Sequence, residues 1–314
     1  MRILVTGATG FIGRQLCTSL VSQGHFVRGV ARTASAPLAG VEFQARDFTQ
    51  AAVIAKSLNG IDCVIHLAGR AHVMNKRMDA PALYRAVNCD ATLQLAQLAM
   101  HAGVKRFVFI SSIGVNGNQS GQQRFDEDSI PAPNADYARS KLDAELGLRR
   151  LLETAAMEGV IIRPPLVYGA DAPGNFRTLL KVVAKGIPSP FAWVRNARSI
   201  VSLDNLCALI SLAAQHPAAA GEVFLVSDGS DVSTHQMLQA LAEGMQARRL
   251  SIPVPAPLLA LLLTLAGKGD LYTQLCGSLT IDCTKAHRLL GYQPHTDTLQ
   301  SLRQVGERYL SCPQ

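Results

Sequence analysis

A glycine-rich turn directly after the first apolar run most limits how this chain can fold. Gly7, Gly10 and Gly13 follow the strand-like residues 2–6, and an amphipathic helical pattern begins at Phe11. Between a strand and a helix, glycines let the backbone approach a pyrophosphate, and the helix presents the positive end of its dipole. The turn therefore predicts a dinucleotide-binding unit, whereas the glycines without this context would indicate only a tight turn.

Short β-rich runs alternate with helical patterns through the first half of the chain. The predicted strands cover residues 3–6, 26–31, 41–44, 64–67, 107–111 and 159–163, and a strand at 222–226 is expected to rejoin the same sheet. The predicted helices cover 10–23, 49–58, 83–102 and 136–158. This alternation predicts an α/β fold, a Rossmann-type doubly wound parallel sheet with helices on both faces.

After Arg163 the alternation of strands and helices gives way to predicted loops and shorter helices, interrupted by several prolines. We expect a dinucleotide-binding domain at 1–165 plus about 199–230, and a smaller, mostly helical C-terminal substrate lobe at about 166–198 plus 231–314. Either two closely joined domains or one interwoven unit fits 314 residues, and the interwoven unit is preferred.

Composition excludes several classes of protein. Hydrophobic residues at 48% and charged residues at 17% exclude a disordered chain. The net charge of +7 comes from scattered lysines and arginines without a basic tract, so no nucleic-acid partner is expected, and a positive field suits an anionic small substrate. Seven cysteines without a C-x-x-C pair indicate buried free thiols in a reducing compartment and no metal.

The opening segment and the longest apolar stretch indicate where in the cell the protein is expected. The chain opens on a strand-like segment rather than a signal peptide, so a cytoplasmic protein is expected. The longest apolar stretch, Pro257–Ala266, is far shorter than the roughly 20 residues of a spanning helix. No integral membrane segment is therefore predicted, and a packed helix or a substrate lid is favoured over a membrane-surface helix.

The end of the second predicted strand indicates which dinucleotide binds. An acidic residue there would accept bonds from the adenosine ribose, but the chain carries Arg32, with Arg28 close by. An arginine pairs with a 2′-phosphate, so NADP(H) is favoured over NAD(H), although Arg32 also fits an ordinary surface loop. Asp47 and Phe48 follow the third predicted strand. They either contact the adenine on two sides or form an ordinary turn.

Tyr137 and Lys141 indicate redox chemistry. At a spacing of four they share one helix face, where an ammonium is expected to lower the pKa of the phenol below its usual value of about 10. Ser111 and Ser112 end the strand at 107–111, at the sheet edge where open α/β folds bind ligands. The competing interpretation of the two serines is capping of backbone groups.

These segments together resemble the extended short-chain dehydrogenase/reductases of the nucleotide-sugar epimerase and dehydratase group. The matching segments, in order, are T-G-A-T-G-F-I-G, V-I-H-L-A-G at 64–69, Asn88, S-S-I-G-V-N-G, Y-A-R-S-K and R-P-P-L-V-Y-G at 163–169. The resemblance covers nearly the whole chain.

The resemblance implies a role for each matching residue. Tyr137 would be the general acid/base, Lys141 its electrostatic partner and ribose ligand, and Ser112, with Ser111 as the competing choice, the hydroxyl that polarises the substrate carbonyl. The residues expected at the cofactor are Gly7, Thr9, Gly10, Phe11, Ile12, Gly13, Arg32, Asp47, Phe48, Leu67, Ala68, Gly69, Asn88, Tyr137, Lys141 and Pro164. Those expected at the substrate are Ser112, Asn116, Asn175 and Arg198, the last of which would clamp a diphosphate. Family members commonly form homodimers through a four-helix bundle.

Within the group, Asn116 in place of the usual tyrosine, the segment 66–74 and Arg32 resemble bacterial 4-ketoreductases of O-antigen synthesis. The expected activity is NADPH-dependent reduction of the C4 ketone of a UDP-linked 2-acetamido-2,6-dideoxy-hexosulose. The alternatives are a UDP-hexose 4-epimerase with tightly bound NAD, a catalytically silent dinucleotide-sensing regulator, and a reductase of a flavonoid-like or steroid-like ketone.

Overall fold

A single parallel sheet forms the centre of the molecule. The computed structural model describes residues 1–33, 38–70, 80–121, 123–248, 251–265 and 269–311. The seven strands, in spatial order, are β3 (Val41–Ala45), β2 (Phe26–Ala31), β1 (Arg2–Thr6), β4 (Cys63–His66), β5 (Arg106–Ile110), β6 (Glu158–Arg163) and β9 (Val223–Leu225). All neighbours pair in parallel, so the predicted doubly wound sheet is confirmed, and β9 rejoins it beside β6.

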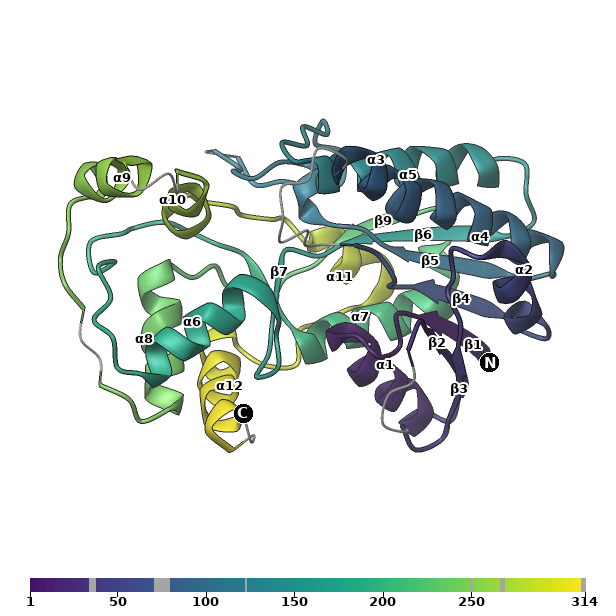
Figure 1. Ribbon diagram of the computed structural model, residues 1–314, viewed down its shortest axis with the longest axis horizontal. Coiled ribbons are helices and arrows are strands. Elements are labelled where there is room, and N and C mark those ends of the chain that lie inside the picture. Colours follow the sequence, from purple (N-terminus) through teal and green to yellow (C-terminus); the bar gives the residue numbers. More distant parts are fainter. Residues whose placement is uncertain (34–37, 71–79, 122, 249–250, 266–268, 312–314) are drawn as a thin grey trace.

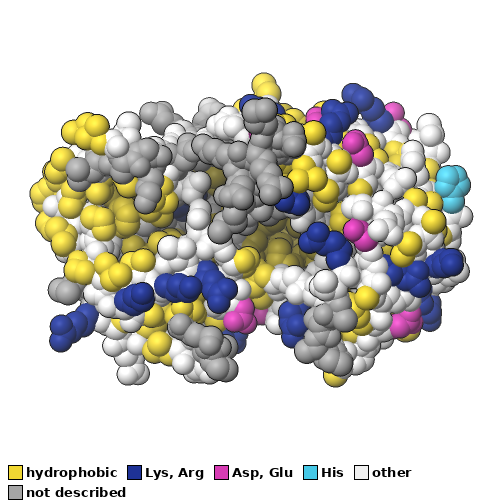
Figure 2. All heavy atoms as spheres, viewed as in Figure 1, with side chains coloured by type: hydrophobic (Ala, Val, Ile, Leu, Met, Phe, Trp, Pro, Cys, Tyr) yellow, Lys and Arg dark blue, Asp and Glu magenta, His cyan; other side chains and the backbone are white. Residues whose placement is uncertain are grey.

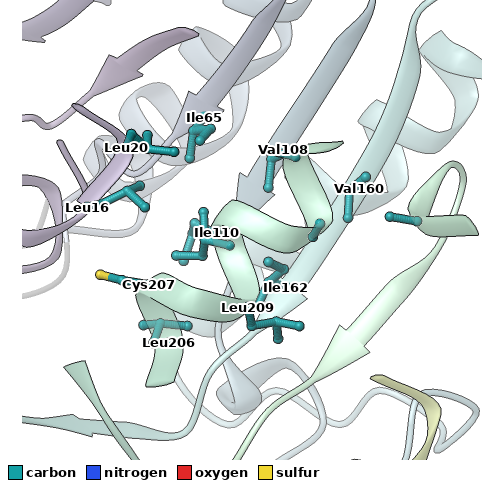
Figure 3. Close-up of a cluster of buried hydrophobic side chains, with 14 of the residues drawn as sticks. Leu16, Leu20, Ile65, Val108, Ile110, Val160, Ile162, Leu206, Cys207 and Leu209 are labelled. Carbon is teal, nitrogen blue, oxygen red and sulfur yellow. The ribbon is translucent and has the colours of Figure 1, made fainter. Parts of the chain in front are cut away.

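Helices cover both faces of this sheet (Figure 1). One face carries α1 (Phe11–Ser22), α7 (Leu203–Gln215) and α11 (Thr284–Leu290), and the other carries α2 (Ala51–Ile54), α3 (Ala80–Tyr84), α4 (Ala91–His101) and α5 (Asp136–Leu152). Alternation along β5 supplies both cores. Val108 and Ile110 pack toward α1 and α7, as Figure 3 shows, while Phe107 and Phe109 pack toward α4 and α5.

The predicted helix limits need correction at three places. The helix expected at 136–158 ends at Leu152, because the chain must turn before Glu158 pairs with Arg106 in the sheet. The helix expected at 83–102 begins at Ala80 and contains a π-helical segment, Arg85–Asp90. The helix expected at 49–58 is α2 followed by a 3₁₀ turn, Ala55–Leu58.

The C-terminal part is mostly helical and has its own apolar cluster. Its elements are β7 (Leu166–Tyr168), α6 (Gly174–Ala184), β8 (Ile200–Ser202), α8 (Thr234–Gly244), α9 (Ala256–Leu265), α10 (Gly269–Cys276) and α12 (Thr298–Ser311). The parallel pair β7 and β8 was not predicted. Helices α8 and α12 cross at Gly244 and Gly306, since a Cβ at Gly244 would lie 1.9 Å from the Arg303 carbonyl oxygen. The proposed domain boundaries stay a prediction.

Cysteines, helix lengths and metal-ligating side chains bear on three further expectations. The six described cysteines are free, and four of them are buried. Within the described ranges no helix has the length and apolarity needed to cross a bilayer. No group of three or more metal-ligating side chains lies among the same residues.

Candidate active site

The predicted reacting side chains meet in one cavity at the carboxyl edge of the sheet. It has a volume of about 230 Å³ and is lined by Ile12, Leu67, Gly69, Ile110, Ser111, Ser112, Tyr137, Lys141, Pro164, Pro165 and Val167. Cavities of about 540 and 360 Å³ elsewhere in the described structure contain none of the predicted catalytic side chains. The chemistry of the lining, rather than cavity size, therefore identifies the candidate site.

The glycine turn provides the geometry that a pyrophosphate needs. Gly7 has a φ of +71° and its carbonyl accepts from the Gly10 N–H at 2.9 Å, so the turn is tight. Helix α1 begins immediately after Gly10 without a side-chain cap and without an acidic residue in its first turn. The positive helix end is therefore open to an anion, and these residues fit a dinucleotide.

Gly13 provides a test of this turn. A Cβ at Gly13 would lie 2.1 Å from the Gly7 carbonyl oxygen and 2.8 Å from the Ala8 Cα. Overpacking of this kind costs about 1–3 kcal/mol, so we expect Gly13→Ala to weaken dinucleotide binding roughly tenfold to a hundredfold, measured by calorimetric titration. The control is Gly269→Ala, where a Cβ would meet nothing within 4 Å. Equal affinities in the two variants would contradict the expectation.

At the adenosine end, the candidate residues have different surroundings. Arg32 is exposed and has no ion-pair partner among the described residues. Arg28 is instead occupied, because its guanidinium bonds to Glu42 at 2.7 Å and to the Ser57 carbonyl at 2.8 Å. The Asp47 carboxylate accepts from the backbone and side chain of Thr49, and Phe48 is buried against the His66 ring. Of the two arginines, only Arg32 is available to a phosphate.

Tyr137 and Lys141 both line the cavity, but their pKa values differ from expectation. The Lys141 ammonium is buried, donates to the Ile110 carbonyl at 2.9 Å and lies 4.5 Å from the centre of the Phe109 ring. Burial lowers the pKa of Lys141 to about 8, against an opposing contribution from Glu145. Burial, with a smaller contribution from Tyr84, raises the pKa of Tyr137 to about 12. The prediction that Lys141 lowers the pKa of Tyr137 is therefore wrong in this structure.

The two serines line the same cavity with different bonding. The Ser112 oxygen accepts from the Gly114 N–H at 3.1 Å, which leaves its hydrogen for a ligand. The Ser111 hydroxyl is buried without a hydrogen-bond partner in the described part of the chain. A buried hydroxyl that lines a cavity and lacks a partner marks a place where a ligand would bond. Both serines therefore stay candidates for the substrate oxygen.

Asn88 joins the cofactor loop to the catalytic helix. From the π-helical segment its side chain accepts from the Arg70 N–H at 2.7 Å and donates to the Arg70 carbonyl and to Ser140, one residue before Lys141. A Cβ at Gly69 would lie 3.1 Å from the Asn88 oxygen, so this loop passes close to the amide. Asn88 thus positions the loop and the helix together.

His66 is a residue whose role sequence reasoning missed. Its ring is fully buried, and burial lowers its pKa to about 3, so the imidazole is neutral. Thr92 donates to the Asn88 carbonyl at 2.8 Å and must therefore accept from His66 Nε2 at 2.9 Å. Nδ1 then accepts from Thr6 at 2.7 Å. This series of hydrogen bonds connects the residue before the glycine turn to Asn88. The histidine at the end of V-I-H was the feature of the sequence that could have indicated this role. The rest of segment 66–74 beyond Arg70 lies outside the described residues.

A buried ion pair behind the catalytic helix was also missed. Arg163 bonds to Glu145 through two nitrogens, with the closest N···O distance 2.5 Å, and the side chains are 3% and 1% exposed. Glu145 stands four residues after Lys141, so its place on the same helix face was visible in the sequence. Arg163 also donates to Asn116 at 3.0 Å, and Asn116 donates to the Asp126 carbonyl. A direct substrate contact of Asn116 stays a prediction that requires exchange of one of these bonds.

The predicted diphosphate contacts lie in the C-terminal part, on either side of α10. Asn175, at the start of α6, donates to Gln274 at 2.8 Å. Arg198 donates to the Gly277 carbonyl at 2.9 Å and has no ion pair with any residue that the structure describes. Burial lowers its pKa. Arg198 does not pair with the nearby carboxylate in the sequence, Asp204, which instead bonds to Gln15 and forms an ion pair with Arg308.

The sheet topology and this cavity define an enzyme of the short-chain dehydrogenase/reductase type. The model of the NAD dependent epimerase/dehydratase family matches residues 3–227, and the chain belongs to that family.

Proteins named for different reactions are similar to this chain along nearly its whole length. A UDP-glucose 4-epimerase of Vibrio cholerae is 40% identical over 99% of this chain and 96% of its own. A 4-hydroxy-2-methyl-3-oxo-4-farnesyl-3,4-dihydroquinoline-1-oxide ketoreductase of Stigmatella aurantiaca is 27% identical over 98% of both chains. The solved UDP-glucuronic acid 4-epimerase of Bacillus cereus, in complex with NAD, is 24% identical with a TM-score of 0.80, covering 99% and 96% of the two chains.

Proposed function

We propose that the protein reduces the C4 ketone of a UDP-linked 2-acetamido-2,6-dideoxy-hexosulose with NADPH. The product would be a UDP-deoxyamino sugar of the quinovosamine or fucosamine type, used in the cytoplasm for cell-surface polysaccharide such as O-antigen. The observation that carries this proposal is the cavity of about 230 Å³ in which Tyr137, Lys141 and the two serines meet. Arg198 and Asn175 would hold the diphosphate.

In the proposed reaction a bound reduced dinucleotide supplies the hydride. Tyr137 donates its proton to the C4 oxygen, because a pKa of about 12 keeps the phenol protonated near neutral pH. Lys141, protonated below a pH of about 8, stabilises the phenolate that remains. Ser112 donates a hydrogen bond to the same C4 oxygen and keeps its proton, since its own oxygen already accepts from Gly114.

The second candidate function is a UDP-hexose 4-epimerase with tightly bound NAD. The Vibrio cholerae relative carries that kind of name, and the solved Bacillus cereus structure contains NAD. The same side chains would serve both reactions. A catalytically silent regulator is disfavoured because Ser112, Tyr137 and Lys141 are all present in one cavity.

One experiment separates the two reactions. The purified protein is incubated with UDP-4-keto-6-deoxy-GlcNAc and either reduced dinucleotide, and the absorbance of the nicotinamide and the product's identity are followed. In parallel, the supernatant of denatured protein is assayed for released NAD, and UDP-hexose interconversion is measured without added reductant. Consumption of NADPH supports the reductase, whereas released NAD with interconversion supports the epimerase.

Arg32 tests the choice of dinucleotide. A charge-assisted bond to phosphate contributes about 1.5–3 kcal/mol, so we expect Arg32→Ser to raise KM for NADPH roughly tenfold to a hundredfold and to leave KM for NADH unchanged. The matched control is Arg150→Ser, an exposed arginine on α5. An equal change in both KM values would contradict recognition of the 2′-phosphate by Arg32.

A homodimer through a four-helix bundle is part of the same proposal. Helices α4 and α5 pack side by side on one sheet face, with Leu93 against Gly147. Leu146 on α5 is 43% exposed, which supports an apolar contact there between two copies.

A further inference from the structure

Exposed apolar side chains gather on one face of the C-terminal part. Six large ones share this region, namely Ile187, Trp193, Ile252, Leu258, Leu261 and Leu265, here called the apolar patch. The segments that carry Ile187, Trp193 and Ile252 lie side by side, since the Ile252 N–H donates to the Ser189 carbonyl at 2.7 Å and Phe191 pairs with Pro253, and α9 begins shortly after Pro253. Figure 2 shows hydrophobic side chains over the end of the molecule where Figure 1 places α9 and α10.

Helix α9 is unusual for the surface of a water-soluble domain. Its sequence, A-P-L-L-A-L-L-L-T-L, has no charged residue. Leu259 is 5% exposed, whereas Leu261 and Leu265 on the same helix are 55% and 76% exposed. A surface helix ordinarily has a polar face, and a helix that is apolar all round is ordinarily covered. This helix therefore needs a partner outside the described structure.

Cations predominate around the apolar patch, although Asp171, Asp204, Glu243 and Asp270 border the segments that form it. Residues 172–203 and 244–269 contain five and three lysines or arginines and no aspartate or glutamate. The exposed cations among them are Arg177, Lys181, Lys185, Arg195 and Arg248, and none forms an ion pair with a described residue. Figure 2 shows a row of such side chains beside the apolar patch, at the level of α6 in Figure 1. An apolar surface bordered by unpaired cations is complementary to an anionic one.

We propose that this face docks on an anionic lipid bilayer, with α9 lying in the plane of the interface. Apolar side chains then enter the acyl boundary while the lysines and arginines contact the headgroups. A second copy of the chain fits less well, because a two-fold interface would place the cations of one copy against those of the other. Helix α10 contacts Asn175, a predicted diphosphate ligand, through Gln274. Docking would therefore bring this predicted substrate contact close to the membrane. This inference does not depend on the proposed reaction.

Trp193 provides a direct reporter. It is the only tryptophan in the chain, belongs to the apolar patch and is 60% exposed. The full chain is mixed with vesicles of phosphatidylglycerol and phosphatidylcholine in equal parts, or of phosphatidylcholine alone. We expect a blue shift of the Trp193 emission and co-sedimentation with the anionic vesicles, both reduced by added salt. Absence of both, or equal binding to the two kinds of vesicle, would overturn the proposal.

Matched variants identify the surface responsible. Leu261→Ser with Leu265→Ser is expected to lower the vesicle-bound fraction about tenfold or more, whereas Ile130→Ser, at a side chain 87% exposed elsewhere, leaves it unchanged. Lys181→Gln with Lys185→Gln weakens binding, and the exposed pair on α5, Arg149→Gln with Arg150→Gln, does not. Thermal melts confirm that each variant is folded.

Light scattering without vesicles completes the test. We expect the Leu261→Ser/Leu265→Ser variant to have the same mass as the parent protein. If the parent self-associates and this variant alone dissociates, the apolar patch is an interface between copies and the proposal is overturned.

Discussion

Replacing Tyr137 with phenylalanine is expected to lower kcat for ketone reduction about 10²–10⁴-fold, the usual contribution of a general acid. The phenol is the cavity's proton donor in the proposed reaction, and its pKa of about 12 means that nearly all of it carries a proton near neutral pH. Phenylalanine keeps the ring, which meets Tyr84 edge to face with centroids 6.2 Å apart, so the fold is retained. The measurement is steady-state consumption of NADPH with the UDP-linked ketone.

Two controls make this result specific. Tyr309→Phe, on α12 and remote from the cavity, is expected to leave kcat unchanged. The affinity of Tyr137→Phe for the dinucleotide, measured by titration, is expected to change far less than kcat, because the ring that lines the cavity is kept. Turnover of Tyr137→Phe at the parent rate, in both the reductase and the epimerase assay, would remove Tyr137 from the chemistry and revive the silent regulator.

The variant Glu145→Gln is expected to lower the free energy of unfolding by about 3–5 kcal/mol, because removal of one partner leaves a buried charge uncompensated. Arg163 is 3% exposed, so its guanidinium has little access to water. Since the charge of Glu145 raises the pKa of Lys141, the same variant is expected to lower the pKa of Lys141 further. Urea denaturation measures the loss of stability.

A pair of the same residue types on the surface is the matched control. Arg303 and Glu243 also form an ion pair, but their side chains are 46% and 27% exposed. Glu243→Gln is therefore expected to cost about 1 kcal/mol or less, as surface pairs do. Equal losses in Glu145→Gln and Glu243→Gln would show that burial does not set the strength of the pair at Arg163.

Much of the fold was predictable, because strand periodicity and glycine turns are local signals. The strand at 26–31 has the predicted limits, and the other sheet strands differ by one residue at one or both ends. The helix limits were less accurate, because the end of α5 depends on pairing between Glu158 and Arg106, far apart in the sequence. The pair β7 and β8 was missed because each strand is only three residues long and its partner is distant in the sequence.

The sequence by itself determined the list of candidate reactive groups, because the turn at Gly7 and the spacing of Tyr137 and Lys141 are properties of neighbouring residues. Only the tertiary structure decided the ionisation of those groups. The pKa values of Tyr137 and Lys141 are set by burial, and burial depends on residues brought together from distant segments. For the same reason Arg28, close to Arg32 in the sequence, is paired with Glu42, while Arg32 remains available.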